Sequence, residues 1–307
     1  MYEQYYSLRE RPFELSPNPR FLFLSKGHRE ALLHLRYGLT GRPGVTLLVG
    51  EAGTGKTTLV RAALQSANGQ NVTIVHLSNP TLTRQEFYEY MALGFAFERE
   101  ATTSKSAFLR ELERAVASRA SAGGVLALIV DEAQSLPHEL LEEIRLLTNT
   151  ESNGQSLAVV LVGQPELASR LNESQLRQLK QRVALRCELT PLDLRDTAAY
   201  IAARVRVAGG NAETLFTRDA VIAIHDHSRG IPRTTSVICD NALVSGFASD
   251  MKPVGRELIL EVCRDFEFGQ VSPRVDELPK APVAAPAKTA DRPLFSGVTK
   301  PRRFSFF

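Results

Sequence analysis

Residues 45–64 read VTLLVGEAGTGKTTLVRAAL, in which an apolar run, a glycine-rich run and a helix-forming run follow one another without interruption. The apolar run from Val45 to Val49 is typical of a buried strand, and the run from Leu59 to Leu64 is typical of a helix. Between them, Gly50 to Thr57 match the pattern G-x-x-x-x-G-K-[ST]. This order of strand, loop and helix predicts a phosphate-binding loop.

The composition of this loop predicts its chemistry. Glycines let backbone N–H groups wrap around phosphate oxygens, and the N-terminus of the following helix favours anions. We expect Lys56 to contact the β- and γ-phosphates of ATP, and the Thr57 hydroxyl to bind Mg²⁺. The expected cofactors are therefore ATP and Mg²⁺, and the expected nucleotide-binding residues are Gly50, Glu51, Ala52, Gly53, Thr54, Gly55, Lys56, Thr57 and Thr58.

The remaining hydrophobic runs predict the fold class. Runs at 71–77, 125–130, 157–162 and 184–189 alternate with helical patterns, as parallel βαβ units require. They predict an α/β P-loop NTPase fold with a parallel β-sheet sandwiched by helices, and helical patterns alone after Asp193 predict a small all-helical lid domain. The expected domains are an N-terminal segment and helix (1–40), an ATPase core (41–190), a lid (191–268) and a disordered Pro/Ala-rich basic tail (269–307).

Two acidic residues follow the apolar strand at 125–130. In open α/β sheets ligands bind at the carboxyl edge of the strands, where Asp131 and Glu132 are expected to lie. Asp131 would bind the metal through its water shell, and Glu132 would polarise the attacking water. The alternative is an acidic helix start with no catalytic role.

Four further polar residues are candidates for contacts with the transferred phosphate. Gln164 directly follows the strand at 157–162, so its amide could reach the γ-phosphate or the lytic water. Arg182, with Arg177 as a weaker candidate, precedes the last strand and could reach the ATP of a neighbouring subunit, because a permanently charged guanidinium suits phosphoryl-transfer charge. Arg233 opens a lid helix and could contact phosphate in its own chain. Turn, surface and capping roles are the respective alternatives.

Composition and charge indicate an ordinary globular protein with a basic end. The net charge is +3, and residues 271–307 hold most of the basic excess, so the preceding residues are close to neutral. The three cysteines are widely spaced and predict neither a disulfide framework nor a zinc site. No run of about 18 apolar residues occurs. We therefore expect a cytoplasmic protein without a membrane span, peripheral at the inner membrane only through partners.

Taken together, these segments resemble the AAA+ ATPases of the ExeA, or general secretion pathway protein A, group over residues 1–268. An N-terminal stretch at 2–31 also carries the resemblance, with Pro12-Phe13, the run from Ser16 to Phe21 and the run from His28 to Ala31; in that family such a segment lies near the adenine. The resemblance implies Walker A at 50–57, Walker B at 131–134, sensor 1 at 163–167, an arginine-finger region at 179–183 and sensor 2 at 230–233.

The resemblance and the motifs together predict a homo-oligomeric, Mg²⁺-dependent ATPase. It would assemble or remodel a cell-envelope secretion or exopolysaccharide export system through protein partners, as the shorter members of the group are associated with such systems. Two alternatives remain: a DNA-transaction ATPase of the transposition target-selector or loader type, and a low-turnover nucleotide-dependent switch. The near-neutral charge before residue 271 and the lack of a helix–turn–helix signal argue against DNA as a partner.

Overall fold

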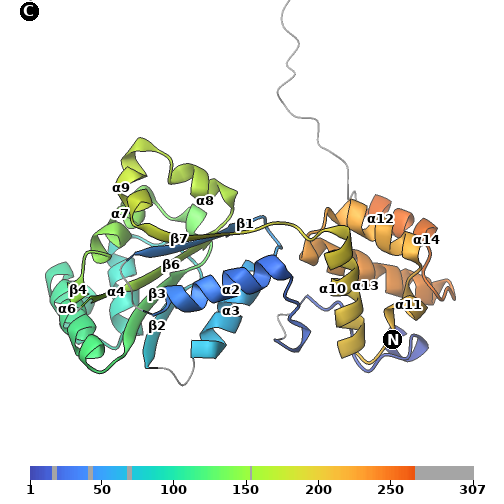
Figure 1. Ribbon diagram of the computed structural model, residues 1–307, viewed down its shortest axis with the longest axis horizontal. Coiled ribbons are helices and arrows are strands. Elements are labelled where there is room, and N and C mark those ends of the chain that lie inside the picture. Colours follow the sequence, from blue (N-terminus) through green and yellow to red (C-terminus); the bar gives the residue numbers. More distant parts are fainter. Residues whose placement is uncertain (16–18, 41–43, 68–70, 153, 267–307) are drawn as a thin grey trace, which may run out of the picture. The chain divides into compact units, whose positions relative to one another are not determined.

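The computed structural model describes residues 1–15, 19–40, 44–67, 71–152 and 154–266. By its internal contacts the chain divides into two compact units, Met1–Gly269 and Gln270–Phe307. The second unit contains the expected basic tail and lies outside the described residues. The first unit contains a sheet with its covering helices and a C-terminal helical region (Figure 1).

A parallel sheet of five strands forms the centre of the α/β part, with strand order β2-β3-β6-β1-β7. Every residue of β1, β3 and β6 is buried, which explains why these runs are continuously apolar rather than alternating. The sheet confirms the predicted α/β fold class. The strands are β1 (Val45–Gly50), β2 (Val72–Leu77), β3 (Val125–Val130), β6 (Ala158–Gly163) and β7 (Val183–Leu189).

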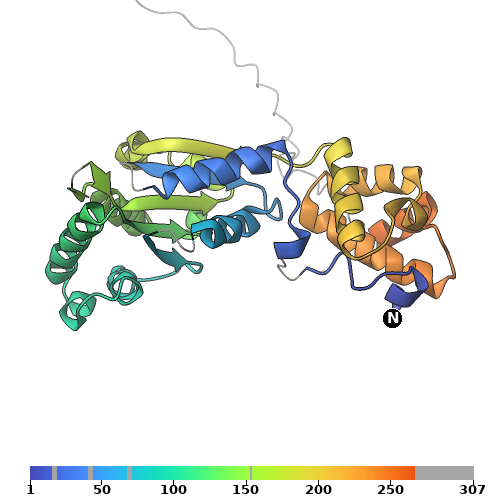
Figure 2. The same cartoon turned by 60° about the horizontal axis from the view of Figure 1, so that its bottom comes forward.

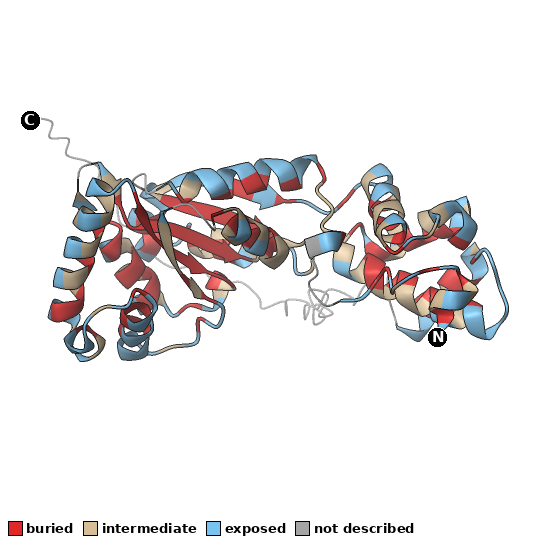
Figure 3. Ribbon diagram, turned by 90° about the horizontal axis from the view of Figure 1, so that it is seen from below, coloured by how far each residue is buried: buried red, intermediate tan, exposed pale blue. Residues whose placement is uncertain are grey.

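Helices cover both faces of the sheet because successive strand residues point to opposite sides. In β3, Leu126, Leu128 and Val130 pack in one hydrophobic core, while Ala127 and Ile129 pack in another. The first core includes α4 (Arg84–Gly94), α6 (Lys105–Ser121) and α7 (His138–Leu147), and the second includes α2 (Lys26–Gly38) and α3 (Lys56–Ala67). Figure 2 shows the sheet and its helices from a second side, and in Figure 3 the buried residues follow the strands.

Shorter elements connect these layers. After β2, the capping box of Thr83 and Glu86 starts α4. The connecting elements are α5 (Arg99–Thr103), the 3₁₀ turn Ala133–Ser135, the strand pair β4 (Glu151–Ser152) and β5 (Gln155–Ser156), α8 (Pro165–Arg170) and α9 (Arg177–Gln181).

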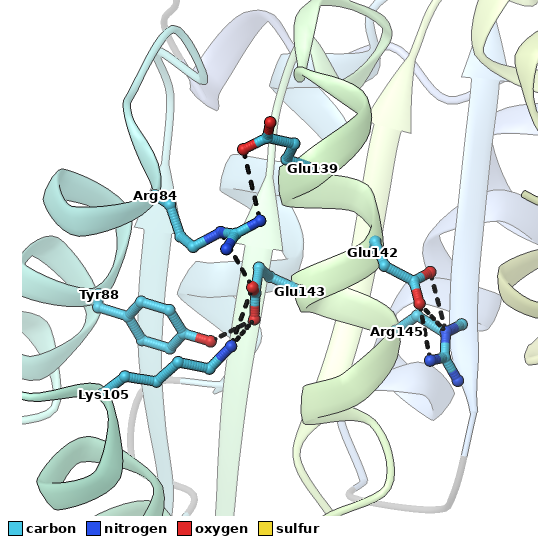
Figure 4. A network of polar contacts seen from close by, with 7 residues as sticks. All are labelled: Arg84, Tyr88, Lys105, Glu139, Glu142, Glu143 and Arg145. Atoms are coloured by element: carbon cyan, nitrogen blue, oxygen red, sulfur yellow. Dashed lines mark hydrogen bonds and ion pairs between the residues drawn. The ribbon is translucent and has the colours of Figure 1, made fainter. Parts of the chain in front are cut away.

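A buried carboxylate ties three of the helices together. Glu143 of α7 accepts hydrogen bonds from Lys105 Nζ at 2.7 Å and Tyr88 OH at 2.5 Å, and Arg84 Nε lies 3.1 Å from it (Figure 4). Burial disfavours the charged form, but the bonds from Lys105 and Tyr88 outweigh it, so the pKa of Glu143 is lowered. The ionised carboxylate therefore joins α4, α6 and α7 on one face of the sheet.

The C-terminal helical region has its own core, and the N-terminus of the chain contributes to it. Tyr2, Tyr6 and Phe13 are buried in this core rather than against the sheet. One helix of this region begins at Pro232, because proline suits the first turn of a helix. The elements are α1 (Tyr2–Tyr5), α10 (Leu194–Val207), α11 (Ala212–Leu215), α12 (Arg218–Ser228), α13 (Pro232–Ala248) and α14 (Arg256–Asp265).

None of the helices in the described parts of the chain is long and apolar enough to cross a lipid bilayer.

Candidate nucleotide-binding site

The glycine-rich loop connects β1 to α3. Gly53 and Gly55 have φ angles of +83° and +102°, a backbone region in which side chains are strained. The loop is thereby bent so that α3 begins at Lys56 directly behind it. The strand, loop and helix order inferred from residues 45–64 is present in the structure.

Lys56 lies inside this loop, with a relative exposure of 5%. Its ammonium donates to the carbonyl oxygens of Gly50 at 2.8 Å and Glu51 at 3.1 Å. Burial lowers the pKa of Lys56, and the negative charges of Glu132 and Asp131 partly offset the effect. A cation is therefore held where the loop can receive phosphate oxygens.

Thr57 and Asp131 are brought together from α3 and the end of β3. The Thr57 hydroxyl donates to Asp131 Oδ2 at 2.8 Å, and Asp131 is buried. Hydroxyl and carboxylate oxygens are the ligand type that Mg²⁺ prefers, and Mg²⁺ in such sites takes its other ligands from water and phosphate. No group of three or more His, Cys, Asp or Glu residues suited to a metal occurs among the described residues. The pair fits a metal that is shared with a nucleotide.

Glu132 lies next to this pair with unusual backbone geometry. Its φ angle is +52°, in the left-handed region that costs free energy for a residue with a side chain. Its carboxylate accepts a hydrogen bond from Gln134 Nε2 at 2.6 Å. Glu132 lines the cavity that the glycine-rich loop borders.

This cavity has a volume of about 360 Å³ and is lined by residues from separate parts of the chain. Besides the loop and Glu132, it is lined by the N-terminal segment and by the helices α10 and α13. Arg204 of α10 holds the N-terminal segment in place by donating to the carbonyl oxygens of Pro12 at 2.5 Å and Glu14 at 2.9 Å. The lining outside the loop and Glu132 consists of Glu14, Leu15, Phe21, Leu22, Phe23, His28, Leu59, Tyr200, Arg204, Pro232, Arg233 and Ser236.

His28 connects the N-terminal segment to the loop. Its Nε2 lies 2.9 Å from the Thr54 carbonyl oxygen, and its Nδ1 lies 2.7 Å from the Ser25 hydroxyl. A carbonyl oxygen can only accept, so Nε2 carries the hydrogen and Nδ1 accepts from Ser25. Burial lowers the pKa of His28, although the bond to Thr54 opposes this. The residue is a neutral support for the loop.

Gln164 lies at the same edge of the sheet. It follows β6, whose last residue Gly163 is in register with Val49 of β1. Its backbone N–H donates to Gln134 Oε1 at 3.0 Å. The strand ends that carry Gly50, Asp131 and Gln164 are thus neighbours through the order β3-β6-β1.

The two arginine candidates lie at different ends of the sheet. Arg233 lines the cavity, and its backbone N–H donates to the Gly53 carbonyl at 3.2 Å. Arg182 donates instead to Asn149, and its carbonyl accepts from Val45 N–H at the start of β1. Five residues of β1 separate that point from Gly50, roughly 17 Å at about 3.3 Å per residue. Arg182 is therefore remote from the cavity of its own chain.

Several residues of the site had no role assigned from sequence. His28, Gln134 and Arg204 each act through contacts that join distant segments, so their individual roles could not be inferred from local spacing. Gln134 lies in the motif at 131–134, two residues after Glu132, and His28 begins the run at 28–31.

Comparison with known proteins agrees with this geometry. Residues 39–171 match the AAA domain family. Over 249 residues, 81% of this chain, the sequence is 41% identical to general secretion pathway protein A of Aeromonas hydrophila, and the chain spans 45% of that protein's length.

Solved structures agree with the fold. The Cdc6p structure of Pyrobaculum aerophilum has a TM-score of 0.61 at 19% identity, covering 83% of this chain and 70% of that one. The Aeropyrum pernix ORC2 protein, in ADPNP and ADP complexes, has a TM-score of 0.59 at 19% identity, covering 83% and 71%. At such identities the likeness concerns the fold alone.

The fold and the glycine-rich loop define a nucleotide-binding P-loop protein of the AAA+ class. Within that class the chain is related to general secretion pathway protein A, as the resemblance of its motifs predicted.

Proposed function

We propose that this chain is a Mg²⁺-dependent ATPase that works as a homo-oligomer to assemble or remodel a cell-envelope secretion or exopolysaccharide export system. The observation that carries the ATPase part is the convergence of Lys56, Thr57, Asp131 and Glu132 at one edge of the sheet. A cation, a pair of oxygen ligands and a separate carboxylate are the parts that phosphoryl transfer to water requires.

Each residue has a distinct part in the proposed reaction. Lys56 leaves its loop carbonyls and binds the β- and γ-phosphates. Thr57 and Asp131 would hold Mg²⁺, Asp131 through the water shell of the ion, and the bound ion would supply positive charge to offset the charge that develops on the phosphate oxygens. Glu132 orients the attacking water and accepts its proton. The Gln164 amide and Arg233 contact the γ-phosphate from the sheet edge and from α13 respectively.

The position of Arg182 supports an oligomer. The backbone of Arg182 lies about 17 Å from Gly50 of its own chain and the residue is exposed, so its guanidinium is available to the phosphate of a neighbouring copy. Mixing an Arg182→Ala protein with a Lys56→Ala protein should therefore restore part of the activity that each lacks. If mixed assemblies are demonstrated but are no more active than each variant alone, the support for a shared site is removed.

The export part rests on the relative, which is named a general secretion pathway protein. The Glu132→Gln variant should be trapped with ATP bound and should retain protein partners from a membrane extract, whereas Lys56→Ala should not. Equal retention of envelope proteins by the two variants would contradict an ATP-dependent role in export.

A role on DNA is the second candidate, because the fold is shared with proteins such as Drosophila ORC bound to DNA, at 19% identity over 83% of this chain and with a TM-score of 0.59. Steady-state hydrolysis measured with and without duplex DNA at two salt concentrations separates the candidates. We expect no stimulation by DNA. Stimulation that decreases with salt would favour the DNA role, since phosphate contacts release counterions.

A further inference from the structure

The side chain of Gln134 uses both ends of its amide at the edge of the sheet. Its Nε2 donates to Glu132 Oε2 at 2.6 Å, and its Oε1 accepts from the Gln164 backbone N–H at 3.0 Å. The amide orientation is fixed by these partners, because a flipped amide would put two donors together and two acceptors together. One side chain thus joins the turn after β3 to the turn after β6.

The surroundings of Gln134 are fitted to this connection. A Cβ atom on Gly163 would lie 2.7 Å from Gln134 Oε1, so the absence of a side chain at 163 makes room for the amide. Arg170 of α8 donates to the carbonyl oxygens of Gln134 at 2.5 Å and Leu136 at 2.9 Å. The turn after β3 is therefore held to the β6–α8 segment by its backbone as well as by a side chain.

We propose that Gln134 is a positioning residue that sets the direction of the Glu132 carboxylate and makes it depend on the β6–α8 turn. A neutral amide orients a carboxylate without pairing it with a cation, so the carboxylate remains able to accept a proton. If a bound γ-phosphate displaced Gln164, the side chain of Gln134 would transmit the movement to Glu132. The inference rests on the proposed hydrolysis of ATP.

Three variants test the inference. Gln134→Leu keeps most of the side-chain volume and removes both hydrogen bonds, and Gln134→Asn keeps the amide but is too short to reach both partners. We expect kcat to fall by roughly 10- to 100-fold in Gln134→Leu, because a misplacement of about 1 Å costs that much. Nucleotide affinity, measured by titration with a fluorescent ATP analogue, should stay within about twofold. The matched control Gln155→Leu, in the β4–β5 pair, should retain native kcat.

A double variant separates positioning from a purely structural role. If Gln134 acts through Glu132, then adding Gln134→Leu to Glu132→Gln should reduce kcat no further. A multiplicative loss in the double variant, a native kcat in Gln134→Leu, or an equal loss of nucleotide affinity would each overturn the inference. Native protein that binds ATP but does not hydrolyse it would instead overturn the proposed function, and the inference with it.

Discussion

Glu132 and Glu143 are two carboxylates of the same α/β part with opposite surroundings. Glu143 is bound by Lys105 and Arg84 and by the Tyr88 hydroxyl, and its exposure is 4%. Glu132 receives a hydrogen bond from one neutral amide and lines a cavity. A carboxylate held by two cations is committed to joining helices, whereas one oriented by an amide keeps its charge for a ligand or a water.

The largest effect should come from changing Glu132. Glu132→Gln removes the proposed proton acceptor and should lower the rate of ATP hydrolysis by about 10²- to 10⁴-fold, the usual contribution of a general base. ATP affinity and thermal stability should remain near native values. Phosphate release measures the rate of hydrolysis, and nucleotide titration on the same samples measures the ATP affinity. The control Glu139→Gln, an exposed glutamate of α7, should hydrolyse ATP at the native rate.

For Glu143 we expect the reverse: a substitution should lower the stability of the fold and leave ATP binding intact. Glu143→Gln leaves the cations of Lys105 and Arg84 without their anion and should lower the free energy of unfolding by about 1–3 kcal/mol, since both cations are partly exposed and can regain water. Folded protein should still bind ATP. Urea denaturation measures the loss, and Glu142→Gln, whose partner is Arg145 on the same helix, should cost less than about 1 kcal/mol. A larger loss from Glu142→Gln would contradict this account.

Acid should remove the difference in stability between native protein and Glu143→Gln. The lowered pKa of Glu143 means that its ionised form stabilises the fold above the ordinary pKa of a glutamate. This contribution is lost as pH falls through the lowered pKa. The stability gap between native protein and Glu143→Gln should therefore be constant near neutrality and close in acid. A gap that widens in acid would mean that Glu143 is not ionised in the fold.

The smallest effect concerns His28. Burial lowers its pKa, so below the ordinary pKa of histidine the unfolded chain takes up a proton before the folded one. Stability should be full above that value and should decrease as pH falls toward the lowered pKa. His28→Gln should flatten this part of the stability profile. An unchanged profile in His28→Gln would show that His28 is not the titrating group.

The sequence predicted those parts of the site that are continuous along the chain. The glycine-rich loop and the pair Asp131 and Glu132 lie where an apolar strand ends, so periodicity and spacing located them. The contact of Gln134 with Gln164 was not predictable, because it depends on β6 lying between β3 and β1. Likewise, no local pattern indicated that Tyr2 and Tyr6 pack with the C-terminal helices. Strand order and terminal packing are decided by tertiary contacts rather than by local preference.

The most direct test of the account is phosphate release by the native protein as a function of its concentration, with Mg²⁺ and with a chelator. We expect Mg²⁺-dependent hydrolysis whose rate per chain rises with concentration, because Arg182 is proposed to complete the site of a neighbouring copy. ATP binding without phosphate release at every concentration would contradict it and would indicate a nucleotide-dependent switch.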